Sequence, residues 1–302
     1  MVNTKPKEVP LVWLQTSSCS GCSVSILNSE SPTIKNIIVD EVLPGKHVSI
    51  RFHPTIMAGS GKKVLEILDE TCEKLGKRYV LVVEGAVPTA EQGVYGGMGT
   101  GEDEHTMLEW LELLGRDAMV VIALGTCASF GGIPAAGENP TGCKSVRQVF
   151  EEKKISTPLV NIPGCPPHPD WFVGTVAQLL AVGPPKPEEL DEHLRPKMFY
   201  GRLVHENCPR RAYFDEGKFA KRFGDEGCLY ELGCKGPLTY ADCPLRLWNG
   251  GANWCVGSGS PCIGCCEPGF PDMFSPLYEK IIDVPIPNIG QFWVRKSGEG
   301  SG

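Results

Sequence analysis

The sequence of 302 residues has no long hydrophobic run. No stretch approaches the roughly 20 apolar residues that a membrane-spanning helix needs, so we expect no transmembrane segment. The charged start, Met1–Pro10, is not followed by an apolar stretch of the kind that forms a secretory leader. The sequence alone therefore predicts a cytoplasmic protein, although a partner can still tether it to a membrane.

An excess of basic charge is also missing. The net charge is -7 at pH 7, whereas binding to a phosphate backbone needs a basic face, so we expect no nucleic acid as a partner. Residues 59–63 read Gly-Ser-Gly-Lys-Lys and lack the spacing of a phosphate-binding loop. With 41% hydrophobic and 22% charged residues, the composition excludes a disordered chain and favours a globular protein with a buried core.

Cysteine, by contrast, is abundant, with 14 residues in the chain. In a reducing compartment disulfides explain such a number poorly, and metal ligation explains it well. Buried structural cysteines would account for only about two or three of them. Most of the cysteines stand beside Gly or Pro, as residues in loops do. The cysteine content therefore predicts metal centres.

The first half of the chain alternates short apolar runs with helical patterns. Both faces of each run are apolar, which is typical of parallel strands covered by helices. The expected strands are Leu11–Gln15, Val48–Phe52, Tyr79–Val83, Met119–Leu124 and Pro158–Ile162, and the expected helices are Gly61–Gly76, Glu102–Gly115 and Asp170–Val182. This alternation predicts a doubly wound α/β domain.

The second half is built differently. A Gly/Pro-rich stretch, Gly183–Pro187, suits a boundary between residues 1–183 and 184–302. From Phe199 to Pro271 the chain is dense in Gly, Pro and Cys and has little periodicity. Metal ligation can stabilise such a segment, because the free energy of ligation becomes free energy of folding. We therefore expect a smaller, mostly irregular metal-binding domain and a C-terminal tail.

A first set of cysteines follows the predicted strands. Cys19 and Cys22 form a C-x2-C after the first strand, and Cys127 and Cys165 follow the fourth and fifth. Because the carboxyl ends of parallel strands share one edge of a sheet, these residues can meet there. Four cysteines suit a [4Fe–4S] cluster. Structural zinc accepts the same ligands, but it usually takes two close pairs, so the two single cysteines favour iron–sulfur.

Two further sets of four lie in the second half. The second set begins with an H-x2-C and consists of His205, Cys208, Cys228 and Cys234. Alone it suits either zinc or a cubane cluster. The third set consists of Cys243, Cys255, Cys262 and Cys265. Eleven cysteines and one histidine thus divide into three sets of four, which favours a chain of electron-transfer clusters.

Several motifs together resemble the small subunits of [NiFe] hydrogenases. They lie in the same order as in that family and span most of the chain. The matching segments are Leu11–Gln15, Cys19–Cys22, Val83–Pro88, Gly125–Ala128, Gly164–Pro169, His205–Cys208 and Pro261–Cys265.

The resemblance implies a fold and three clusters. The fold is a flavodoxin-like domain followed by a cluster-binding domain. The first set is expected to hold the proximal cluster, the third set the medial cluster and the second set the distal cluster. Many relatives have a proline in the medial set and a [3Fe–4S] cluster. Because Cys255 stands at that position here, we expect three [4Fe–4S] clusters.

The resemblance also implies a function within a larger enzyme. A large subunit, the obligate partner, oxidises H2 at a nickel–iron centre, and this chain binds no nickel. Electrons then pass through the proximal, medial and distal clusters to an external acceptor such as a quinone, a cytochrome or another redox protein.

An alternative is the iron–sulfur subunit of a quinone-reductase-type complex, which would leave the second and third sets unused. A zinc-stabilised binding module is the non-redox alternative.

A few other residues are candidates for roles near the first set. Glu84 follows the third strand, and two interpretations stay open: an ordinary hydrogen-bonded carboxylate, or a role in a proton path or at the subunit interface. His53 and His168 flank the same edge and either tune the first cluster or only pack. The remaining cysteines are expected in the core or without a role: Cys72, Cys143 and Cys266.

Overall fold

A five-stranded parallel sheet forms the first part of the molecule. The computed structural model describes residues 7–33, 35–36, 46–101 and 104–280. The strand order is β2-β1-β3-β7-β9, the 2-1-3-4-5 order of flavodoxin-like folds. The strands are β1 Lys7–Gln15, β2 Lys46–Phe52, β3 Val80–Glu84, β7 Val120–Leu124 and β9 Leu159–Ile162. The predicted α/β class and all five strands are confirmed.

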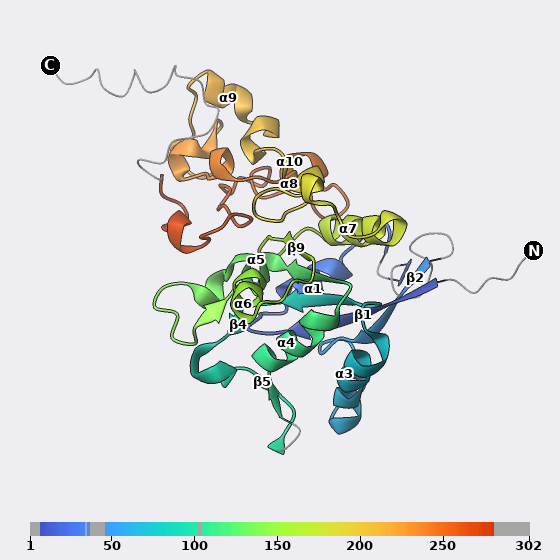
Figure 1. The fold of residues 1–302 in the computed structure, drawn as a ribbon. Helices are drawn as coiled ribbons and strands as arrows, with labels where there is room; N and C mark the ends of the chain where they lie inside the picture. The colour runs from blue at the N-terminus through green and yellow to red at the C-terminus, as the bar shows by residue number, and fades with distance from the viewer. Residues whose placement is uncertain (1–6, 34, 37–45, 102–103, 281–302) are drawn as a thin grey trace, which may run out of the picture.

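Helices cover both faces of this sheet (Figure 1). Alternate residues of β1 point to opposite sides, so that Leu11 and Trp13 enter one apolar core while Val12 and Leu14 enter the other. The first core includes residues of α1 and α7, and the second includes residues of α3, α4 and α6. These helices are α1 Gly21–Leu27, α3 Lys62–Leu75, α4 Met107–Asp117, α6 Val146–Lys153 and α7 Pro169–Val182.

The predicted bounds of α4 are wrong at both ends. The helix begins at Met107 because Thr106 caps it: the Thr106 hydroxyl accepts from the Glu109 amide at 3.1 Å, and the Glu109 carboxylate accepts from the Thr106 amide at 2.7 Å. Glu102, where we expected the start, lies outside the described residues. The helix also passes Gly115, whose missing side chain leaves room for the ring of Phe150.

The rest of the chain consists of short elements. In the first part these are α5 Gly125–Phe130, the turns η1 Ala90–Gly93 and η3 Ile133–Ala135, and the strands β4 Val87–Pro88, β5 Gly97–Met98, β6 His105–Thr106 and β8 Cys143–Lys144. After α7 come η4 Pro187–Glu189, α8 Lys197–Tyr200, η5 Val204–Asn207, α9 Arg211–Asp215, η6 Leu229–Leu232, η7 Gly236–Leu238, α10 Cys243–Arg246 and η8 Asp272–Phe274.

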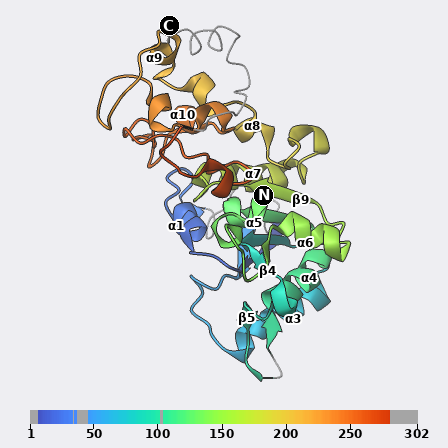
Figure 2. The ribbon, with the colours of Figure 1, turned by 90° about the vertical axis from the view of Figure 1, so that its left-hand side faces the viewer.

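This second, irregular part lies over the sheet on the side of α5, β9 and α7 (Figures 1 and 2). Buried polar contacts join the two parts: the Tyr200 hydroxyl donates to the Pro163 carbonyl at 2.8 Å, and the Trp171 indole donates to Asp242 at 2.7 Å. The irregular segment thus packs on the edge where the strands end. In the described part of the chain, no helix is long and apolar enough to cross a membrane. The predicted tail beyond residue 280 lies outside that part.

Candidate functional site

The four cysteines of the first set gather at the carboxyl edge of the sheet. Cys19 lies in the turn between β1 and α1, Cys22 is the second residue of α1, Cys127 lies in α5 directly after β7, and Cys165 follows β9. Burial raises the pKa of the Cys22 thiol, and so do the Glu84 carboxylate and the other three thiols of the set. The structure therefore brings these four predicted residues within electrostatic range of one another.

Glycine backbone surrounds two of these sulfur atoms. A Cβ atom at Gly125, where φ is +86°, would overlap the Cys22 sulfur. One at Gly132, where φ is +53°, would lie 3.0 Å from the Cys127 sulfur. Side chains are thus excluded from the space beside the thiols, and bare backbone lines it, as a bulky inorganic cluster requires.

A fully buried carboxylate, that of Glu84, holds the turn that carries Cys19 and Cys22. Among its donors are the Cys22 amide at 3.1 Å and the Ser23 amide at 3.2 Å. Its side-chain donors are Trp13, Gln15, Ser18 and Ser23. Burial by itself would raise the pKa of Glu84, but the hydrogen bonds lower it below its usual value. The group is therefore held as a carboxylate that accepts hydrogen bonds.

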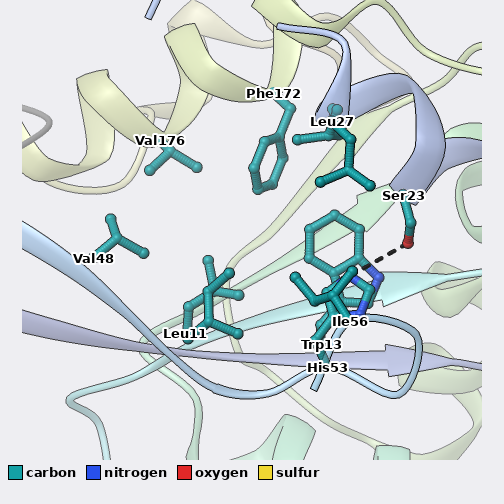
Figure 3. A pocket seen from close by; sticks show the side chains of 11 residues that line it. Leu11, Trp13, Ser23, Leu27, Val48, His53, Ile56, Phe172 and Val176 are labelled. Atoms are coloured by element: carbon teal, nitrogen blue, oxygen red, sulfur yellow. Dashed lines mark hydrogen bonds between the residues drawn. The ribbon is translucent and has the colours of Figure 1, made fainter. Parts of the chain in front are cut away.

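An apolar pocket lies next to this network, between α1, α7 and β2 (Figure 3). Trp13 and His53 form part of its wall, with ring centroids 4.7 Å apart. The His53 Nε2 atom lies 3.3 Å from the Ser23 hydroxyl, which in turn donates to Glu84. His53 thus contacts the first set through two side chains rather than directly, and burial lowers its pKa.

His168, on the same edge, contacts the second part of the chain. It caps α7, because its Nδ1 atom accepts from the Asp170 amide at 3.0 Å. Its Nε2 atom lies 2.5 Å from the Leu247 carbonyl oxygen, and its ring packs on Trp248. These contacts support the packing role that was one of its two predicted roles.

The second set lies around η5 and η6. Burial, together with the neighbouring thiols of Cys228 and Cys208, raises the pKa of Cys234 to about 12. His205 lies one turn before Cys208 and is buried, and burial lowers its pKa to about 4. Its Nε2 atom has no hydrogen-bond partner among the described residues. A neutral, buried imidazole with a free nitrogen atom is suited to bind a metal.

The third set lies between the other two. Burial raises the pKa of the Cys243 thiol, and the thiols of Cys265 and Cys255 raise it further. Cys262 is likewise near Cys255 and Cys265. The Cys262 amide also donates to the sulfur of Cys234, in the second set, at 3.3 Å.

A second contact joins the third set to the first. The Cys266 thiol and the backbone of Cys165 both lower the pKa of the Cys265 thiol, whereas burial and the Cys265 thiol raise the pKa of Cys165, so Cys165 and Cys265 lie close together. The three sets therefore follow one another in space in the order first, third, second.

The three remaining cysteines belong to no set. Cys72 packs at the edge of a core, and Cys143 is buried with its sulfur 3.2 Å from the Thr141 hydroxyl. Cys266 is buried with its sulfur 3.9 Å from that of Cys265. All 14 cysteines lie in the described part of the chain, and all are free thiols.

The described residues contain no group of three or more His, Cys, Asp or Glu side chains that could hold one metal ion. Each thiolate of a [4Fe–4S] cluster binds a different iron atom, so a cluster does not need ligands that converge on one point.

The sequence did not predict two buried polar side chains of the site. Thr126 bonds to the backbone of Gly164 and of Cys265, and Lys235 lies beside Cys234 and Cys262. Thr126 adjoins a predicted ligand, but its partner Cys265 is 139 residues away, and no local pattern signals such a contact. Lys235 likewise adjoins Cys234, and a lysine beside a cysteine is in most proteins a surface residue.

Two protein families match the chain. Residues 200–278 match the family described as the C-terminal part of the NiFe/NiFeSe hydrogenase small subunit. Residues 19–179 match the family described as NADH ubiquinone oxidoreductase, 20 Kd subunit. The two matches fall on the irregular second part and on the sheet-bearing first part of the molecule.

Individual relatives match over nearly the whole chain. The periplasmic [NiFeSe] hydrogenase small subunit of Desulfomicrobium baculatum is 47% identical, and the match covers 90% of this chain and 87% of that protein. The hydrogenase-2 small chain of Escherichia coli K12 is 41% identical over 88% of this chain and 69% of its own length. The crystal structure of the reduced, active Ni-Fe-Se hydrogenase from Desulfomicrobium baculatum superposes with a TM-score of 0.85 over 91% of this chain and 100% of that chain. The chain therefore belongs to the family of NiFe and NiFeSe hydrogenase small subunits.

Proposed function

We propose that the chain is the electron-transfer subunit of a hydrogenase and relays electrons from H2 oxidation in a large partner subunit. The observation that carries this proposal is the order of the three ligand sets, linked by the contacts of Cys165 with Cys265 and of Cys262 with Cys234. An electron that enters at the sheet edge thereby has a continuous route through the irregular part of the chain.

Each set is proposed to hold one [4Fe–4S] cluster. The proximal cluster belongs to the first set, the medial cluster to the third and the distal cluster to the second. The donor sets fit such clusters: glycine backbone lies beside the sulfur atoms of Cys22 and Cys127, and the Nε2 atom of His205 has no hydrogen-bond partner among the described residues. When bound, the clusters supply one-electron redox chemistry.

The chain's own residues position these ligands and screen part of them from water. Burial, helped by neighbouring thiols, raises the pKa of the Cys243 and Cys262 thiols. Iron binds the thiolate form, so cluster binding and loss of these protons are coupled. A neutral histidine at the distal set gives that cluster one less negative charge than a fourth thiolate would, which is one determinant of its potential.

The partners follow from the same proposal. We propose a large subunit that carries the nickel–iron centre as the obligate partner, and a quinone, a cytochrome or another redox protein as the external acceptor. The match of residues 19–179 to the quinone oxidoreductase subunit favours the alternative complex for the first part only. The second and third sets would be unused in that alternative, so the hydrogenase assignment accounts for more of the chain.

We further propose a domain boundary between residues 183 and 184 and a cytoplasmic location. Helix α7 ends at Val182, Gly183 follows it, and the two family matches stop and start on either side of these residues. The three cysteines outside the ligand sets form no disulfide in the described part of the chain, which fits a reducing compartment. One of the relatives is named periplasmic, so fractionation of cells is the decisive test of location.

The test of function is H2-dependent reduction of a viologen dye by the complex purified with this chain. We expect the wild-type complex to reduce the dye. A complex with Cys234→Ala should reduce it far more slowly, while isotope exchange between D2 and water continues, because exchange needs no electron to leave through the clusters. No dye reduction and no exchange by the wild-type complex would contradict the proposal.

A further inference from the structure

One buried hydroxyl, that of Thr126, joins the first ligand set to the third. Thr126 is 1% exposed and precedes Cys127 in α5. Its hydroxyl oxygen accepts from the Gly164 amide at 2.9 Å, and the hydroxyl donates to the Cys265 carbonyl oxygen. The Thr126 amide also donates to the Gly164 carbonyl at 3.0 Å. One side chain therefore links α5, the loop after β9 and the loop that carries Cys265.

The linked loops are those in which the two sets touch. The backbone of Cys165 lies within electrostatic range of the Cys265 thiol, while the Cys165 sulfur itself belongs to the first set. The preceding residue, Gly164, has φ of +149°, and a Cβ atom there would lie 2.5 Å from the Pro167 backbone. The backbone at Gly164 therefore accepts only glycine, and the Thr126 hydroxyl links it to the loop that carries Cys265.

We propose that Thr126 is a positioning residue that sets the gap for electron transfer between the proximal and medial clusters. This inference rests on the proposed function. In each transfer one electron leaves the proximal cluster and one arrives at the medial cluster, and no bond forms or breaks. The rate of such a transfer falls steeply as the gap widens, so a link across the gap controls the rate. Thr126 itself carries no electron.

A purely structural role predicts a different outcome. Buried backbone N–H and C=O groups need partners, and Thr126 supplies one to each of two such groups. If that were its only role, loss of the hydroxyl would lower stability or iron content without changing the coupling between clusters that remain bound.

The test uses three variants of the intact complex. Thr126→Val keeps the shape and removes the hydroxyl, and Thr126→Ser keeps the hydroxyl. Thr71→Val is the matched control, because Thr71 is 2% exposed and its hydroxyl donates at 2.6 Å to the Ile67 carbonyl within α3, a helix that carries no residue of the three ligand sets. The measurements are iron content, D2–water exchange, H2-dependent viologen reduction and the EPR spectrum of the H2-reduced complex.

For Thr126→Val we expect unchanged iron content and unchanged D2–water exchange. We also expect an altered spin–spin splitting between the reduced clusters. Viologen reduction should be about tenfold slower, because misplacement of the reacting groups by about 1 Å can cost more than tenfold in rate. Thr126→Ser and Thr71→Val should match the wild type in all four measurements.

A wild-type spectrum and turnover in Thr126→Val would overturn the inference. So would loss of iron from Thr126→Val but not from Thr71→Val, because the hydroxyl would then hold the ligand loops rather than set the gap. A wild-type complex without exchange or without clusters would instead contradict the proposed function.

Discussion

At the Cys19–Cys22 turn a single carboxylate, that of Glu84, replaces water as the acceptor for several buried donors. Two of these donors are backbone amides of the turn itself, at Cys22 and Ser23. We predicted either an ordinary hydrogen-bonded carboxylate or a role in a proton path or at the interface. The number of donors and the lowered pKa of Glu84 favour a group that stays ionised and positions the turn.

Glu84→Gln distinguishes these roles. An amide nitrogen would replace one acceptor oxygen and leave buried donors unpaired, so we expect a loss of stability on the order of 3 kcal/mol and weaker retention of iron. Iron content and thermal unfolding of the purified complex give the readout. Intact clusters and unchanged stability with slowed turnover would instead support the proton path.

At the third set, Cys255 determines the number of irons that we expect in the medial cluster. Relatives that have proline at this position lack the fourth thiolate. We expect Cys255→Pro to convert the medial [4Fe–4S] cluster to [3Fe–4S], because one iron would lose its ligand. The EPR spectrum of the oxidised complex should then show a stoichiometric three-iron signal. The same signal in the oxidised wild-type complex would contradict the assignment of Cys255.

At the scale of elements, a buried ion cluster joins the segment after η4 to the segment after Cys265. Arg195 is 2% exposed, and its guanidinium contacts Asp191 at 2.7 Å and Glu267 at 2.9 Å. It also donates to the Cys266 carbonyl at 3.0 Å. Because Glu267 is buried and Asp191 is half-buried, these ion pairs stabilise the packing of the two segments against each other.

Arg195→Met should lower the free energy of unfolding by about 3–5 kcal/mol, because it leaves the buried Glu267 carboxylate and the half-buried Asp191 carboxylate without a cation. Arg147→Met is the control, since Arg147 pairs with Glu151 on the surface, where an ion pair contributes about 0–1 kcal/mol. Thermal unfolding of both variant complexes measures the difference. Equal melting temperatures would show that the buried cluster adds no more than the exposed pair.

The elements also differ in how far the sequence predicts them. The five strands are apolar on both faces, which is a strong local signal. Helices α1 and α5 were not predicted, because they span only 7 and 6 residues and begin within the ligand turns. The bounds of α4 were predicted wrongly, because Gly115 packs on Phe150 instead of ending the helix.

At the scale of the whole molecule, the gathering of the four cysteines of the first set at one edge was predictable from topology, and the contacts between the sets were not. Parallel strands bring their carboxyl ends to one edge, so Cys127 and Cys165 had to approach the Cys19–Cys22 turn. The contact of Cys165 with Cys265 depends instead on how an irregular chain packs on that edge. No periodicity in the sequence predicts such packing. The contacts between the ligand sets could therefore be identified only from the structure.

The metal content of the native complex, purified without oxygen with whatever partner follows the chain, tests the central claim most directly. If each ligand set holds a [4Fe–4S] cluster, about twelve irons per chain should be found, together with nickel in the partner subunit. About four irons without nickel would indicate the quinone-reductase-type complex, and zinc without iron would contradict the electron-transfer function altogether.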